Sequence, residues 1–132
     1  MKIETQVDAV VHFIHKMDIE MLNDILDDKL TYQDMEKHRF LDMLEIAFDA
    51  IKRAGNEFLI PHKGMCNRSD CNYKFKGYSF RGDNTGAHID LIIEQTDGIV
   101  EDIYECDEFR CKPKTASSTG LRVQLDVEDC PF

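Results

Sequence analysis

Apolar residues in the first half of the chain recur three and four positions apart, which is the spacing of amphipathic helices. The stripes predicted to be helical lie at positions 7–17, 19–26 and 40–51. Between the second and third stripes, Leu30–Gln33 is predicted to be a brief extended segment. Gly55 follows the third stripe and is expected to end the long helix, because glycine readily adopts the left-handed conformation found after helix C-termini.

Polar residues stand where these helices are expected to begin. The predicted N-caps are Thr5, which pairs with Asp8, then Asp18 and Asp34. Their side-chain oxygens can accept hydrogen bonds from the free amides of a first helical turn. We therefore expect one helix to start at each of these three positions.

Beyond the third stripe, apolar and polar residues alternate, which predicts β-strands. The expected strands lie at about 57–65, 73–82, 87–96 and 99–107. Asp83–Gly86 and Asp97–Gly98 have the composition of hairpin turns, so these strands should form an antiparallel meander. We expect a single domain, 1–132, with its core at about 5–109 and a C-terminal extension at 112–132.

The lengths of the two turns set the strand register and sort the side chains between the two faces of the sheet. A four-residue first turn places Phe80 opposite Ile89, and a two-residue second turn places Ile89 opposite Cys106. The more apolar face then carries Lys76, Tyr78, Phe80, Ile89, Leu91, Ile93, Asp102, Tyr104 and Cys106. We assign this face to the inner side, beneath the long helix, and expect Tyr32 to point towards it.

The composition narrows the classes of function. A chain of 132 residues with 42% hydrophobic residues suits one domain, and its net charge of −10 opposes binding to nucleic acid. Charged residues interrupt the apolar stretch of segment 1–18, unlike in a signal peptide, and no apolar run reaches membrane-spanning length. We expect a cytoplasmic protein whose five cysteines are reduced thiols or metal ligands.

The predicted order of elements is similar to that of the nuclear transport factor 2-like superfamily, which includes polyketide cyclases and ketosteroid isomerase. Met17–Leu22 resembles the superfamily's turn into its second helix, Leu30–Tyr32 its first strand, and Asp97–Ile103 its final hairpin. The resemblance implies an α+β fold, in which N-terminal helices pack on a curved antiparallel meander sheet to form a cone. It also implies an open pocket and often a dimer, but no particular activity, because members of the superfamily do unrelated chemistry.

Three functions are compatible with this pattern. The first is a small-molecule-binding module with an apolar pocket lined by Tyr32, Tyr78, Phe80, Leu91 and Tyr104. The second is an enzyme for proton transfer, isomerisation or cyclisation of a small carbonyl compound. Asp102 would be its base, because an apolar pocket wall raises the pKa of a carboxyl group; the plainer interpretation is a solvated or Lys76-paired carboxylate. The third is an interaction protein whose cone is filled by side chains.

The opposite, outer face carries a mixed set of side chains. His88 and Asp90 lie two residues apart on one strand and project from the same side, as the parts of an oriented base would. The plainer interpretation is a solvated or interface pair, because such pairs are commoner than catalytic ones. Phe75, Ile92 and Ile103 form an apolar stripe that a monomer would expose, so we expect a homodimer through this face.

Two cysteine pairs flank the predicted strands, Cys66 with Cys71 and Cys106 with Cys111. His62 and Cys66 share a face on a regular strand, and the next turn can bring Cys71 opposite Cys66, which suits a zinc ion. At ~3.3 Å per residue the meander holds Cys106 about 30 Å from Cys71, so Cys106 should take no part. Unligated thiols or a nucleophilic cysteine are the alternatives, and we expect no other cofactor.

Overall fold

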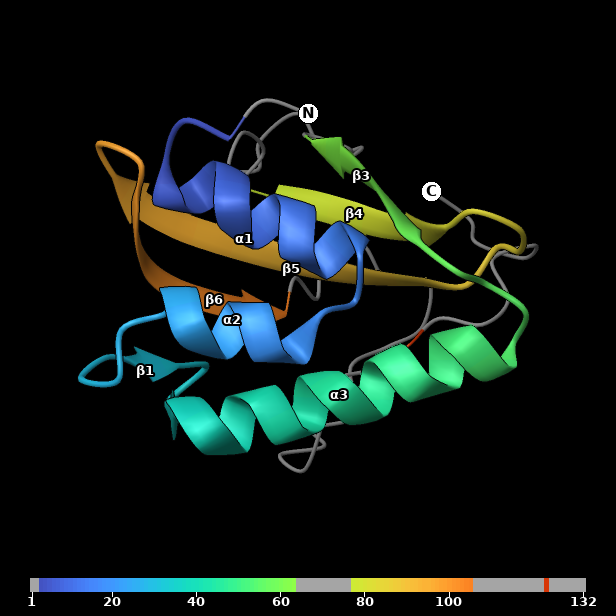
Figure 1. The fold of residues 1–132 in the computed structure, drawn as a ribbon, viewed down its shortest axis with the longest axis horizontal. Helices are drawn as coiled ribbons and strands as arrows, with labels where there is room; N and C mark the ends of the chain where they lie inside the picture. The colour runs from blue at the N-terminus through green and yellow to red at the C-terminus, as the bar shows by residue number, and fades with distance from the viewer. Residues whose placement is uncertain (1–2, 64–76, 106–122, 124–132) are drawn as a thin grey trace.

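The computed structural model describes residues 3–63, 77–105 and 123 of the chain. Its helices and strands are α1 (Gln6–His15), α2 (Ile19–Ile25), β1 (Thr31–Tyr32), β2 (Met35–Glu36), α3 (Lys37–Arg53), β3 (Leu59–Lys63), β4 (Gly77–Gly82), β5 (His88–Thr96) and β6 (Ile99–Glu105) (Figure 1). The four cysteines that flank the predicted strands lie outside the described residues, as does Phe75.

The helix ends follow the predicted chemistry except at the start of α3. Thr5 and Asp18 cap α1 and α2, each accepting a hydrogen bond of 3.1 Å from the amide three residues further on. Gly55 follows α3 with φ 108°, as expected of a C-terminal stop. The N-cap of α3 is Glu36, however, and Asp34 lies in the left-handed turn between β1 and β2. The predicted capping role of Asp34 is therefore wrong.

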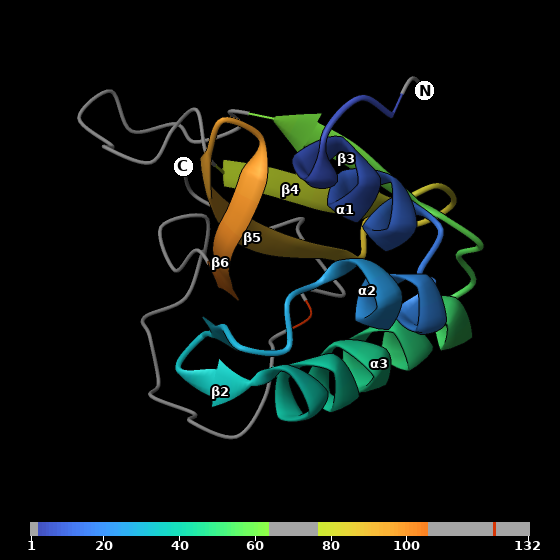
Figure 2. The same cartoon turned by 60° about the vertical axis from the view of Figure 1, so that its left-hand side comes forward.

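The described strands form the predicted antiparallel meander. β3, β4, β5 and β6 pair in that order, Phe80 lies opposite Ile89, and β1 pairs with β2 in a separate hairpin. Figures 1 and 2 show α2 lying between α1 and α3, and β6 running towards the β1–β2 hairpin. The α+β class, with helices followed by an antiparallel sheet, is confirmed and is compatible with a nuclear transport factor 2-like fold.

The core lies between the helices and one face of the sheet, the inner face. The inner-face residues in this core are Leu59, Tyr78, Phe80, Ile89, Leu91, Ile93 and Ile103. The helices contribute Val10, Ile14, Leu22, Phe40, Leu44, Phe48 and Ile51. Burying each such side chain contributes about 1.5–3 kcal/mol, so this contact supplies most of the hydrophobic stabilisation of the described residues.

A β-bulge changes the pairing of β5 with β6. Gln95 pairs with Val100, as the two-residue turn predicts, but Glu94 pairs with Asp102. Glu101 is therefore an additional residue in β6. Because side chains alternate along a strand, one extra residue moves every later β6 side chain to the opposite face.

The bulge corrects the predicted faces of three residues. Ile103 was predicted on the outer face, but it pairs with Ile93 on the inner face and is only 1% exposed. Asp102 and Tyr104 were predicted on the inner face, but they lie on the outer face. Ile92, also predicted to be exposed, is 4% exposed. The exposure predicted for the apolar stripe is thus wrong at both described positions, and the homodimer stays an untested prediction.

Among the described residues, no helix combines the length and apolarity needed to cross a bilayer.

Candidate functional site

Four polar side chains gather on the outer face of β4 and β5, and we call them the outer-face cluster: Ser79, Arg81, His88 and Asp90. Ser79 lies opposite Asp90, and Arg81 lies opposite His88. Residues two apart on a strand share a face, so all four project from the same side of the sheet. Ser79, His88 and Asp90 are 1%, 5% and 7% exposed, respectively.

A hydrogen bond joins the two buried ionisable groups of the cluster. His88 Nδ1 lies 2.9 Å from Asp90 Oδ1. An ionised carboxylate can only accept, so Nδ1 carries the proton in this bond. In a neutral imidazole this arrangement leaves Nε2 with its lone pair. Asp90 therefore orients His88 and sets its tautomer, as carboxylates do for histidines that act as bases or ligands.

The other half of the cluster is a second hydrogen bond. Arg81 Nε donates to Ser79 Oγ at 3.2 Å. The hydrogen bonds of the described residues thus link Ser79 to Arg81 rather than to His88, which does not support a serine nucleophile activated by His88. Arg81 is only half-buried, as is His62, which lies opposite Ser79 on β3. The cluster is therefore closed around Ser79 and more open at Arg81 and His62.

The burial of this cluster differs from the sequence-based expectation. The spacing of His88 and Asp90 indicated a shared face, but we expected that face to be solvated or to lie in an interface between copies. Both side chains are instead buried within the chain itself. The register of Phe80 with Ile89 already places Ser79 and Arg81 beside this pair. No feature of the alternation, however, tells a buried outer face from a solvated one.

The residues predicted to line an inner pocket are mostly core residues. Tyr32, Phe80 and Leu91 are fully buried, and the Tyr32 hydroxyl donates to the carbonyl of Asp27 at 3.1 Å. Burial raises the pKa of Tyr32 above its ordinary value of 10.0. These three side chains belong to the core between the helices and the sheet.

The two other tyrosines predicted for the pocket lie apart from each other. Tyr78 is on the inner face, stacks on Phe80 with ring centroids 5.6 Å apart, and has the Lys63 ammonium 5.8 Å from its ring centroid. Burial raises the pKa of Tyr78. Tyr104 is half-buried on the outer face, opposite Ile92. The sheet therefore separates Tyr104 from the other predicted pocket residues.

Asp102, the base predicted from sequence, lies at the edge of the sheet and is half-buried. Its Oδ1 accepts hydrogen bonds from the amides of Gln33 at 3.0 Å and Ile103 at 2.8 Å. Burial raises the pKa of Asp102 above 3.8, although the two amides act in the opposite direction. The direction of this shift agrees with the sequence-based argument, but the carboxylate is engaged in joining β6 to the turn after β1.

The predicted zinc site can be followed only through His62. His62 is half-buried on the outer face of β3, while Cys66 and Cys71 lie outside the described residues. Within residues 3–63 and 77–105, no three His, Cys, Asp or Glu side chains come together as a metal site would require. Zinc binding by His62, Cys66 and Cys71 stays a prediction.

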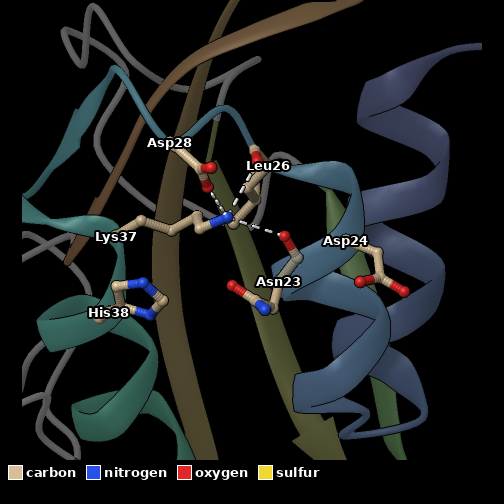
Figure 3. Close-up of a pocket in the computed structure, with 6 residues that line it drawn as sticks. All are labelled: Asn23, Asp24, Leu26, Asp28, Lys37 and His38. Atoms are coloured by element: carbon tan, nitrogen blue, oxygen red, sulfur yellow. Dashed lines mark hydrogen bonds and ion pairs between the residues drawn. The ribbon is translucent and has the colours of Figure 1, made fainter.

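A second polar group surrounds the buried ammonium of Lys37, at the start of α3 (Figure 3). Lys37 Nζ donates to the carbonyls of Asn23 at 2.9 Å and Leu26 at 3.4 Å, and forms an ion pair with Asp28. The hydrogen bond from Lys37 lowers the pKa of Asp28. Together with His38 and Asp24, these residues line a hollow of about 370 Å³. The ammonium satisfies carbonyls at the C-terminal end of α2, which indicates a structural role.

No known protein family, curated protein or solved structure matches this chain. The support for the α+β architecture is therefore the structure itself. Membership in the nuclear transport factor 2-like superfamily stays a prediction.

Proposed function

We propose that the protein is a cytoplasmic small-molecule-binding module of the nuclear transport factor 2-like superfamily, and that its ligand binds at the outer-face cluster. The observation that carries the proposal is the buried hydrogen bond between His88 and Asp90, with the buried hydroxyl of Ser79 beside it. Burying such groups costs free energy that apolar side chains of similar size would not. The chain keeps these polar groups buried despite that cost, which supports a binding role here.

The inner face offers less support for ligand binding than the outer-face cluster does. Tyr32, Phe80 and Leu91 pack against helix residues in one continuous core. A ligand there would have to displace side chains, each of which contributes about 1.5–3 kcal/mol to folding. At the outer face, Arg81 and His62 are only half-buried, so a ligand can contact them with a smaller rearrangement.

Binding is tested by NMR titration of the labelled protein with a set of small acids, amines and ketones. We expect saturable shifts in residues of β4 and β5 and in the His88 side chain, and weaker binding by His88→Gln. The matched control is His38→Gln, because His38 is exposed on α3. Saturable shifts confined to inner-face residues, or no saturable shift with any compound, would contradict the proposal.

A second candidate function is proton transfer next to a carbonyl group, which the orientation of His88 by Asp90 favours. In this reaction His88 Nε2 takes a proton from the carbon beside the carbonyl, leaving an imidazolium and an enolate. The imidazolium then returns a proton to the same or a different carbon. His88 replaces Asp102 as the favoured base, because Asp102 Oδ1 is held by two backbone amides.

This second function has its own assay. Small ketones and 2-oxo acids are incubated with the protein in D2O, and deuterium incorporation is followed by NMR. We expect catalysed exchange that His88→Gln abolishes and His38→Gln retains. Exchange at the uncatalysed rate, in a protein that still binds compounds at the cluster, would leave the binding function and remove the enzymatic one.

A further inference from the structure

We infer that the ligand of the outer-face cluster carries an oxyanion, a carboxylate or a phosphate, which Arg81 and His62 hold at the open side of the cluster. This inference rests on the proposed binding function and adds the chemical class of the ligand.

Among the described residues, one side-chain hydrogen bond positions the guanidinium of Arg81. Its Nε donates to Ser79 Oγ at 3.2 Å, and Ser79 is almost fully buried, so this bond directs the arginine side chain along the sheet. A guanidinium has five N–H donors in a rigid plane, and its terminal pair matches the two oxygens of a carboxylate or phosphate. Among the described residues, no carboxylate forms an ion pair with Arg81.

His62 adds a second nitrogen donor near this guanidinium. It lies opposite Ser79 in the pairing of β3 with β4, on the same face as Arg81, and is half-buried like Arg81. An imidazole can donate one hydrogen bond when neutral and two when protonated. Arg81 and His62 therefore flank Ser79 with groups that suit a single small anion.

The local charge contrasts with that of the whole chain, whose net charge is −10. The outer-face positions of β3 and β4 in the described residues are Ile60, His62, Gly77, Ser79 and Arg81, and none of them is acidic. Among the described strand residues, the carboxylate that lies opposite Ser79 is that of Asp90, which is bonded to His88. In a chain with a net charge of −10, a described corner that carries Arg81 and His62 and no acidic residue on β3 or β4 is a favourable place for an anion.

The test compares probes that differ in charge but share a ring. Benzoate, phenyl phosphate and the neutral benzamide are titrated into the full chain at low ionic strength, with NMR shifts of β3 to β5 as the readout. We expect at least one anion to bind about 10-fold more tightly than benzamide, since hydrogen bonds to charged groups are the stronger ones. Comparing benzoate with phenyl phosphate separates a carboxylate ligand from a phosphate ligand.

Two variants assign the effect to Arg81. Arg81→Gln should remove the preference for anions, and Arg81→Lys should keep only part of it, because lysine retains the charge but not the planar fork. Arg39→Gln is the matched control, since Arg39 is exposed on α3. Thermal melts check that the variants fold. If Arg81→Gln does not fold, the test relies on Arg81→Lys.

The outcomes separate the two proposals. Benzamide binding at the cluster as tightly as the anions would overturn the oxyanion inference and leave the binding function standing. Anion binding that Arg81→Gln or Arg81→Lys leaves unchanged would also overturn it. Failure of all three probes, together with the whole compound set, would remove the binding function as well.

Discussion

The carboxylate of Asp102 accepts a hydrogen bond of 3.0 Å from the backbone amide of Gln33, which joins two parts of the chain that are 69 positions apart. The Gln33 side chain makes a second hydrogen bond to β6, in which its Oε1 accepts from the amide of Glu105 at 2.8 Å. Gln33 and Asp34 are both left-handed, with φ of 52° and 60°, a conformation that costs free energy for residues other than glycine. The contacts to β6 help to hold this turn against the edge of the sheet.

Two substitutions of Asp102 distinguish the contribution of its hydrogen bonds to stability from that of its charge. Asp102→Ala removes the acceptor for two amides and should cost about 1–3 kcal/mol of unfolding free energy. Asp102→Asn keeps an oxygen acceptor without the half-buried charge, so it should be at least as stable as the wild type at pH 7. Urea unfolding of the three proteins is the measurement. An Asn variant that loses as much stability as the Ala variant would show that the charge itself is needed.

The difference in unfolding free energy between Asp102→Asn and the wild type should change with pH in one direction. The folded-state pKa of Asp102 lies above its ordinary value of 3.8, so between these two values the unfolded chain has already lost the proton that the folded chain retains. Ionisation of Asp102 therefore lowers the stability of the wild type as pH rises through this interval. We expect the advantage of Asp102→Asn to shrink as pH falls from 7 towards 4. An advantage that grows on acidification would mean that the shift has the opposite direction.

The sequence predicts most of the fold because its signals are local. The turn Asp97–Gly98, the caps Thr5 and Asp18, and the stop at Gly55 each depend on a few neighbouring residues, and all occur as expected. Asp34 misled the prediction because a tight turn and an N-cap favour the same residue types. Here the turn prevails, since β1 and β2 pair across it.

The candidate site was harder to predict because it depends on a bulge and on burial. Val100 and Ile103 both face the core, three positions apart, which strict alternation does not allow. That spacing, with the acidic pair Glu101 and Asp102 between them, was the available signal for a bulge. For His88 and its neighbours, alternation predicts a shared face correctly, but it contains no information about what buries that face.

Asn56 is expected to be among the polar residues most sensitive to substitution. Its Oδ1 accepts from the amides of Asn84 at 2.9 Å and Thr85 at 2.8 Å, and its Nδ2 donates to the carbonyl of Ile51 and the hydroxyl of Thr85. Asn56→Ala leaves several of these groups unpaired and should cost about 3 kcal/mol or more. Asn84→Ala is the control, because Asn84 is exposed. Equal losses at the two positions in thermal melts would contradict this ranking.

Lys37→Met should destabilise the contact between α2 and α3. The substitution keeps the length of the side chain but removes the donor for the carbonyls of Asn23 and Leu26, and we expect a loss of about 1–3 kcal/mol. Lys52→Met is the control, since Lys52 is exposed on the same helix. Chemical unfolding measures both. A Lys37→Met protein as stable as Lys52→Met would show that solvent can satisfy these carbonyls equally well.

The His88 and Asp90 pair gives the sharpest test of whether the outer face is buried. Asp90→Ala removes the partner of a buried imidazole and should cost about 1–3 kcal/mol, because the unpaired group keeps its desolvation penalty. Replacing both residues with leucine removes both polar groups and leaves neither unpaired. The double variant should therefore lose less free energy of unfolding than the single variants His88→Leu and Asp90→Leu lose in sum. Asp42→Ala, at an exposed position on α3, is the reference for a solvated carboxylate. If Asp90→Ala costs no more stability than Asp42→Ala, and the leucine losses are additive, the outer face is solvated, as we expected from the sequence.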